Sequence, residues 1–360
     1  MKKILFQLAM LFAMGAMLYS CKGDGNPMMK NATGKPGETV VVIAKKYWDG
    51  AIGDTIFHFL AQPQADLPKE EPVLNVVNIP PEAFGEIFKT SRNIVLTRIS
   101  PTVKEPSLTI QRNVWSKPQI IVTVQAPDQQ SFLDYFAKKG NDIVGIFVKA
   151  ERDRLMATYA DRKFKNQGIA NAMEKEHNFT INVPKGFVIA SDTNNFVWIR
   201  YETPEIDQSL IAYWYPYTSD STFTQKYLLD KRDSVLKINV KGPDPGDYMT
   251  TERRIPTLFR AFKLNGNYTV TMRGLWKVHG AFMGGPFVSL TTLDPIRGRV
   301  LTLEGYIYAP KYDKRELLRQ VEAMIYSVRF PDQEKNDKIN RMAEMGNDVE
   351  APADSVQEKK

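Results

Sequence analysis

The sequence predicts an α+β fold with two domains, each a mostly antiparallel sheet covered by helices. The chain has 360 residues, of which 43% are hydrophobic, and this length and composition favour two globular cores over one. Short runs rich in β-branched and aromatic residues alternate with segments whose apolar residues recur every three or four positions. The first pattern is typical of strands and the second of amphipathic helices. Proline, glycine and asparagine separate most of the strand-like runs, which favours antiparallel turns.

The first domain is expected to span residues 38–176. Its strands are predicted at 38–45, 72–79, 92–100, 107–115 and 118–126. Apolar residues at helical spacing predict a helix over 51–61, and Pro80-Pro81-Glu82 opens a short one. Asp128 is a suitable N-cap for a further helix. A longer helical pattern from Asp142 to Lys175 is expected to lead out of this domain.

The second domain is expected to span residues 177–330. It begins with four short strands separated by turn residues, the spacing of an antiparallel meander. A helix is predicted at 222–238, and Asn265-Gly266 predicts the turn of a hairpin. Gly284-Gly285-Pro286 indicates a tight turn between two strands, and the alternative is a place where backbone approaches a ligand. The stripe of apolar residues within 312–328 predicts an amphipathic helix that closes the domain.

The first twenty residues have the layout of a lipoprotein signal peptide. A basic MKK start precedes the apolar run ILFQLAMLFAMGAML, which is too short for a comfortable transmembrane helix. The run leads into Leu18-Tyr19-Ser20-Cys21, which resembles a bacterial lipobox, and Cys21 is the only cysteine in the sequence. The resemblance implies that the Cys21 thiolate takes up a diacylglyceryl group. Cleavage before Cys21 then makes this cysteine the first residue of the mature chain. The alternative is a plain secretory signal followed by an unrelated cysteine.

The segments outside the two domains indicate an anchored protein of the cell envelope. Residues 21–37 are rich in glycine, proline and lysine and are expected to form a flexible tether. Only one acid follows Lys22 in KGDG, and the sequence thus does not resemble surface-exported lipoproteins, which tend to carry a denser acidic run there. This favours the periplasmic face, with inner or outer membrane left open. Residues 331–360 are polar and are expected to be disordered. Lysine and arginine outnumber the acids by 48 to 41, but the excess is spread along the chain, so no nucleic-acid partner is expected.

Several longer segments carry a family resemblance. They are NFVWIRYE, GPDPGDYMTTE, RGLWKVHGAFMGGPFVSL and EGYIYAPKYDKRELLRQVEAMIYS. Together they resemble a family of Bacteroidetes lipoproteins catalogued only as a domain of unknown function. The resemblance covers about residues 35–330; it implies an envelope location and no particular activity. The layout of the second domain is also similar to the PsbP and Mog1 type of α/β/α sandwich, which mostly serves binding.

No local motif identifies a reaction. The sequence lacks the nucleophile elbow, the phosphate-binding loop and the zinc-protease motif. Its three histidines lie far apart, so neither a metal nor a cofactor is expected. His279 is the candidate for proton transfer if a carboxylate orients it, and the alternative is a turn histidine that bonds to backbone. Arg232 and Asp233 are expected either to pair with Arg200 or Glu202 or to lie on a solvated helix face.

The sequence therefore favours a lipid-anchored envelope protein with a non-catalytic binding or assembly role. The candidate binding residues are Arg200, Trp214, Tyr248, Arg273, Trp276 and His279. Trp198 and Trp214, with neighbouring tyrosines, either line a pocket or pack against the sheet. Two alternatives stay open: a hydrolase that uses His279, and a carrier that holds a small ligand on the aromatic strands. Partners are expected to be the membrane through Cys21, another envelope protein or a small ligand.

The lipid anchor gives the first prediction. Cys21→Ser should leave an unprocessed or soluble precursor, because serine has no thiolate to alkylate. Membrane fractionation, gel mobility and incorporation of labelled palmitate measure this, with Ser20→Ala as a control that keeps the small residue before the cysteine. Unchanged membrane retention and mobility in Cys21→Ser would contradict the anchor.

Overall fold

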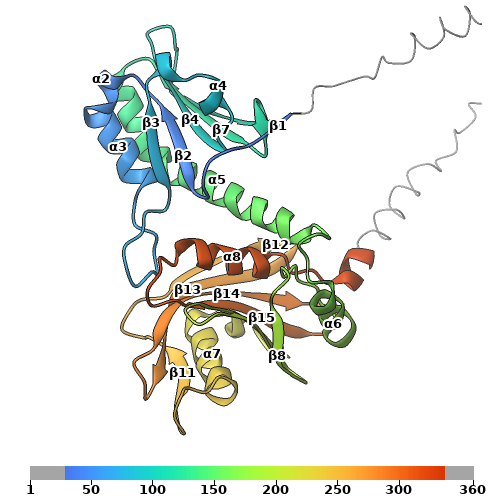
Figure 1. Cartoon of the computed structure of the whole chain (residues 1–360). Helices are drawn as coiled ribbons and strands as arrows, with labels where there is room; N and C mark the ends of the chain where they lie inside the picture. The colour runs from blue at the N-terminus through green and yellow to red at the C-terminus, as the bar shows by residue number, and fades with distance from the viewer. Residues whose placement is uncertain (1–28, 337–360) are drawn as a thin grey trace, which may run out of the picture.

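The computed structural model describes residues 29–336 and shows an α+β protein with two domains, as predicted (Figure 1). The predicted signal peptide, residues 21–28 of the predicted tether, which include Cys21, and residues 337–360 of the predicted tail lie outside the described residues. Residues 30–33, expected to belong to the flexible tether, instead form backbone hydrogen bonds with the first domain. Residues 331–336, expected to be disordered, are helical, and Gln333 there exchanges hydrogen bonds with Asn267. Between residues 29 and 336, no helix is long and apolar enough to cross a membrane.

The first domain contains a five-stranded sheet in the order β3-β2-β4-β7-β5. The strands are β2 (Glu38–Val42), β3 (Asn75–Ile79), β4 (Asn93–Ile99), β5 (Ser107–Arg112) and β7 (Ile120–Ala126). Every neighbouring pair is parallel except β5 with β7, so this sheet is mixed instead of mostly antiparallel as expected. Helix α3 (Ala51–Leu60) lies between β2 and β3 in the chain. Such a crossover lets the second strand run in the same direction as the first.

Helices α3 and α5 bury the core of the first domain against its sheet. Helix α5 (Gln129–Ala160) begins where the Ser131 amide donates to Asp128 Oδ1 at 2.9 Å, which confirms the predicted N-cap. Its fully buried phenylalanines pack against the β-branched strands. The smaller elements are β1 (Lys30–Asn31), α2 (Lys45–Trp48), the 3-10 turn Pro81–Ala83, α4 (Glu86–Lys89) and β6 (Ser116–Lys117).

The long helical pattern predicted up to Lys175 is divided between two helices. Helix α5 ends at Ala160, and α6 (Gln167–His177) begins after Asn166, whose side chain accepts from the Ile169 amide. The buried face of α6, including Ile169 and Met173, belongs to the core of the second domain. Helix α5 is therefore the last element of the first domain, and the capped break at Asn166 redirects the chain.

The second domain contains an eight-stranded antiparallel sheet. Seven strands follow the order β11-β13-β14-β15-β10-β9-β8, and β12 pairs with the far half of β13. The strands are β8 (Val188–Thr193), β9 (Phe196–Glu202), β10 (Asp207–Pro216), β11 (Tyr248–Thr251), β12 (Leu258–Leu264), β13 (Asn267–His279), β14 (Gly284–Asp294) and β15 (Arg299–Tyr308). Asn265 and Gly266, both with positive φ, form the predicted hairpin turn between β12 and β13.

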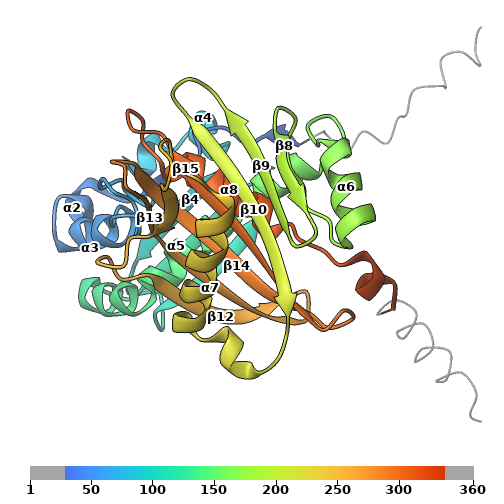
Figure 2. The same cartoon turned by 90° about the horizontal axis from the view of Figure 1, so that it is seen from below.

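Helices cover both faces of this sheet. Helix α7 (Gln225–Asn239), which follows a 3-10 turn at Asp220–Phe223, packs on one face, and α6 and α8 (Arg315–Tyr326) pack on the other. Figure 2 shows α7 crossing the sheet on the side away from the first domain. Each strand sends alternate side chains into two separate cores, as the period of two requires. The layout is an α/β/α sandwich.

The Gly-Gly-Pro run opens strand β14 and does not form a turn, contrary to the prediction. A Cβ on Gly285 would lie 2.1 Å from the carbonyl oxygen of Ile307, and one on Gly284 would lie 2.7 Å from that of Trp276. The glycines thus allow two neighbouring backbones to approach closely. The turn itself comes earlier, after Gly280, whose φ is +98°.

A buried ion pair attaches α7 to the sheet. Arg232 donates from Nε and Nη2 to the two carboxylate oxygens of Glu304 on β15, each at 2.7 Å, and both side chains are fully buried. Arg232 Nη1 also donates to Thr251 on β11, while Asp233 accepts from the Thr251 amide and from Arg253. The prediction that Arg232 and Asp233 pair with Arg200 or Glu202 is therefore wrong. Arg200 and Glu202 lie on β9 and form an ion pair with each other.

The first domain packs on the α8 face of the second. Glu71 accepts hydrogen bonds from the Lys314 and Arg315 amides at 2.6 and 2.9 Å, so it caps α8 from the other domain. Arg319 donates to the Val73 carbonyl oxygen. The Arg152 guanidinium of α5 lies 3.9 Å from the centre of the Tyr326 ring of α8. Figure 1 shows α8 between α5 and the second sheet, which leaves the α7 face free of the first domain.

The Arg232–Glu304 pair gives a stability prediction. Arg232→Met should lower the free energy of unfolding by about 3–5 kcal/mol, because it leaves the Glu304 carboxylate buried without its partner. The double variant with Glu304→Leu should recover most of this loss, since neither charge is then buried alone. Urea unfolding followed by circular dichroism measures both variants.

Lys226 on the same helix is the matched control, because its ion pair with Asp230 is exposed to solvent. Lys226→Met should unfold at nearly the unsubstituted urea concentration. If Arg232→Met behaved like this control, the anchoring role of the buried pair would be refuted.

Candidate binding pocket

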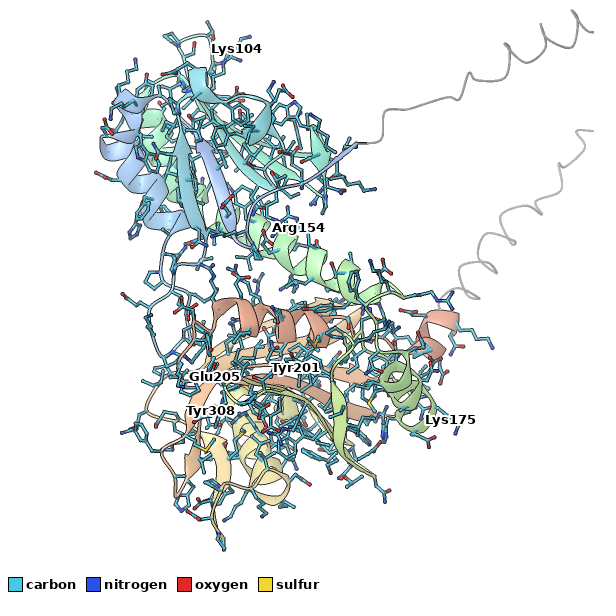
Figure 3. The ribbon with its side chains drawn as sticks, viewed as in Figure 1. Lys104, Arg154, Lys175, Tyr201, Glu205 and Tyr308 are labelled. Atoms are coloured by element: carbon cyan, nitrogen blue, oxygen red, sulfur yellow. The ribbon has the colours of Figure 1, made fainter. Side chains whose placement is uncertain are left out.

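A pocket of about 290 Å³ opens on the α7 face of the second sheet. The residues that characterise it are Trp198 and Arg200 of β9, Asp207 of β10, Trp276 of β13, and Tyr306 and Tyr308 of β15. Tyr308 is labelled in the second domain in Figure 3. The segment after α7, from Val240 to Pro243, forms one wall. The pocket exists because α7 ends at Asn239 and leaves the end of the sheet beyond it uncovered by helix.

The floor of the pocket is aromatic and rigid. Trp276 and Tyr306 are 3% and 2% exposed, and their rings meet edge to face at 5.5 Å. The Trp276 indole nitrogen donates to the Ile307 carbonyl oxygen at 3.3 Å. Burial raises the pKa of Tyr306, so this phenol stays neutral at ordinary pH. The floor therefore offers apolar ring surface without a free charge.

One end of the pocket is polar, and its charged groups are paired with one another, although the buried Arg200 Nε has no hydrogen-bond partner among the described residues. Arg200 donates to Asp207 at 2.8 Å and lies 3.1 Å from Glu202. Asp207 also accepts from Ser209 at 2.8 Å, and the Trp198 indole donates to Ser209 at 3.2 Å. Burial disfavours the guanidinium charge, but the hydrogen bond and charge of Asp207 outweigh it and raise the pKa of Arg200. The guanidinium also covers the Trp198 ring at 4.7 Å.

Two glycine-containing segments meet at the rim. Tyr248 pairs with His279 across the β11–β13 ladder, and their rings stack with centres 4.8 Å apart. Asp247 forms the turn before Tyr248, and it fits because Gly242 and Gly280 both lack a side chain. A Cβ on Gly242 would lie 2.4 Å from Asp247 Cβ, and one on Gly280 1.8 Å from Asp247 Oδ1. Glycine at these positions therefore holds the segment 241–248 against the strand that forms the floor.

His279 directly follows the lining residue Val278 but is not part of the pocket lining, and it is exposed to solvent. Its ring contacts Tyr248, and across residues 29–336 no hydrogen bond or ion pair joins it to a carboxylate. The histidine that does contact a carboxylate is His177, which sequence reasoning did not select. His177 Nε2 lies 2.8 Å from Asp192 Oδ1, and the His177 ring packs on Trp214 at 4.8 Å. This pair joins α6 to the edge strand β8.

The sheet separates the other predicted binding residues. Arg200 and Trp276 line the pocket, whereas Tyr248 and His279 pair with each other beside the lining residues Met249 and Val278 and do not line it. Trp214 and Arg273 lie on the opposite face, where Arg273 donates to Glu322 of α8 at 3.0 Å. Alternation along β10 and β13 causes this separation, because neighbouring residues of a strand point to opposite faces. Trp198 and Trp214 therefore do not share a cavity.

Sequence reasoning missed several pocket residues. They are Asp207, Val240, Met249, Val278, Met283, Tyr306 and Tyr308. Strand alternation would have placed Tyr306 and Tyr308 on one face, but the pairing of β15 with β10 joins segments almost a hundred residues apart. In the part of the chain that the structure describes, no three histidine, cysteine or acidic side chains gather as a possible metal site.

The close contact between Gly280 and Asp247 predicts that two glycine substitutions at the same φ lower the free energy of unfolding by different amounts. Gly280 and Gly246 both have φ +98°, but a Cβ on Gly246 would contact nothing within 4 Å. Gly280→Ala should therefore lower the free energy of unfolding by more than Gly246→Ala, whose strain alone costs about 1 kcal/mol. Thermal unfolding and hydrogen exchange of residues 241–248 measure the two variants. Equal losses would show that the Gly280–Asp247 contact does not position the rim.

Comparison with known proteins finds similarity without an established function. No curated protein matches the chain. Among solved structures, the Ran-binding protein Mog1p of Saccharomyces cerevisiae is 9% identical, with a TM-score of 0.29 over 43% of this chain and 92% of that one. LpqN of Mycobacterium tuberculosis, described as involved in cell envelope biogenesis, is 17% identical, with a TM-score of 0.26 over 41% and 79%. TM-scores this low support no inference.

Two family models match consecutive parts of the chain. Their boundary coincides with the break between α5 and α6. Residues 32–160 match the domain of unknown function DUF8532, and residues 166–327 match the domain of unknown function DUF4837.

Proposed function

We propose that this chain is a lipid-anchored protein of the cell envelope whose second domain binds a small ligand without chemical change. The observation that carries the proposal is the pocket beyond the end of α7, between the segment 240–243 and the sheet, with aromatic rings on its floor. Concave, mostly apolar sites with a few fixed polar groups are typical of ligand binding. The lipobox-like sequence before Cys21 supports the location.

The state of the polar groups favours binding over catalysis at this pocket. A general acid or base needs a titratable group that can exchange a proton with the substrate. Asp207 accepts from Arg200 and Ser209, and Tyr306 is held neutral by burial. The Asp207 carboxylate is thus engaged by its two donors, and the raised pKa of Tyr306 makes its phenol a weaker acid than an exposed tyrosine.

Assembly with another envelope protein is the second candidate function. Ile255, Leu258, Phe259 and Tyr268 are large apolar side chains exposed on or beside the edge strand β12. Edge strands with exposed apolar residues are sites at which another chain can pair. This surface is separate from the pocket floor, so the two roles are compatible.

Mass spectrometry of the full chain purified from envelopes tests the binding proposal. Met283 lines the pocket, whereas its neighbour Phe282 is fully exposed. A co-purified small molecule should be present in the unsubstituted chain and in Phe282→Trp, and absent from Met283→Trp, whose indole fills the pocket. If Met283→Trp retained the same molecule, or no molecule accompanied any of the chains, ligand binding in this pocket would be rejected.

A further inference from the structure

We infer that the pocket accepts the aliphatic chain of a lipid or fatty acid, with the polar head left at the open mouth. This inference rests on the proposed binding function and names the chemical class of its ligand. It follows from the shape of the lining, from the pairing of its polar groups and from the kind of apolar side chain at the wall.

The lining residues are spread across the strands more than along them. It runs from Met249 on β11 to Trp198 on β9, and these strands are the two ends of a row of six. Neighbouring strands are about 4.8 Å apart, so this row of strands is about 24 Å across, and all of them except β14 contribute lining residues. Along the strands the lining covers only two inward positions, such as Trp276 and Val278, which is about 7 Å. A slot of this shape fits an extended chain better than a compact ring.

The polar groups favour a ligand that asks for few hydrogen bonds. An anion would find the Arg200 charge already neutralised by Asp207 and Glu202. A cation would compete with Arg200 for Asp207 and for the face of the Trp198 ring. A sugar needs several free donors and acceptors, but both indole nitrogens in the pocket are bonded, one to Ser209 and one to a backbone carbonyl.

The apolar wall suits a flexible chain. Met249 and Met283 line the slot together with Val240 and Val278. Methionine has an unbranched, polarisable side chain that adapts to irregular apolar ligands. Met283 and Tyr308 are only partly buried, so apolar surface of the lining is in contact with water. Covering it with methylene groups is favourable by about 25 cal/mol per Å².

The test uses tryptophan emission from the chain beginning at residue 22, which keeps every residue that the structure describes. Dibromostearate quenches indoles that its bromine atoms contact, and stearate is the reference that does not quench. The protein has five tryptophans, and we expect saturable quenching of the two in the pocket. Trp198→Phe should reduce the quenched fraction, whereas Trp214→Phe, on the opposite face of the sheet, should leave it unchanged.

A charge in the slot gives a second, independent readout. Met283→Arg should weaken the apparent Kd for dibromostearate by about tenfold or more, because an unpaired charge then faces the methylene chain. Phe282→Arg, one residue away on the exposed side of the turn, should bind like the unsubstituted chain. Vesicles of dibromophosphatidylcholine repeat the measurement and identify whether a free fatty acid or a phospholipid supplies the chain.

The inference is overturned if neither brominated probe gives saturable quenching, or if Met283→Arg and Phe282→Arg bind equally well. Its failure differs from failure of the proposed function. A pocket-dependent molecule in the mass spectra combined with no quenching would reject the aliphatic class alone. Absence of both signals would reject binding at this pocket altogether.

Discussion

The second domain is organised around the Arg232–Glu304 ion pair, in which both side chains are fully removed from water. Two charges in such a place are tolerated only in near-ideal geometry, which the two 2.7 Å contacts supply. The pair fixes the position of α7 on β15, and the bond to Thr251 adds β11 to the same anchor. Because α7 is held there and ends at Asn239, the end of the sheet beyond this helix stays uncovered, and the pocket occupies that space.

Local features of the fold could be predicted from the sequence, because they depend on residues close together in the chain. The Asp128 cap, the Asn265-Gly266 hairpin and the amphipathic helix before residue 327 are of this kind. Strand direction in the first domain could not be predicted, because the sequences of β4 and β7 fit a parallel and an antiparallel pairing equally well. The direction is set by which strands become neighbours, and β4 pairs with β7 instead of with β5, which lies between them in the chain. The partner of Arg232 was equally inaccessible, because Glu304 lies 72 residues further along the chain.

For the candidate site, the residue types in the sequence indicated which segments take part, but not the face of the sheet to which each side chain points. The run RGLWKVHGAFMGG does contain the floor residue Trp276, but the candidate His279 lies outside the pocket lining. Yet Arg273, three positions before Trp276, points to the opposite side and pairs with Glu322. The glycines explain why this run and GPDPGD belong together. Gly242 and Gly280 each leave room for Asp247, a tertiary contact that no spacing rule within either segment reveals.

The cap that Glu71 places on α8 has a consequence for modularity. Although separate family models match the two domains, the first amides of α8 find their acceptor in the neighbouring domain. Excising residues 166–327 as a cassette would leave those amides bare and remove the bond that Arg319 makes to Val73. Exchanging one half for that of another protein would require the same carboxylate at the same place. The interface thus makes each domain depend on the other, although separate family models match them.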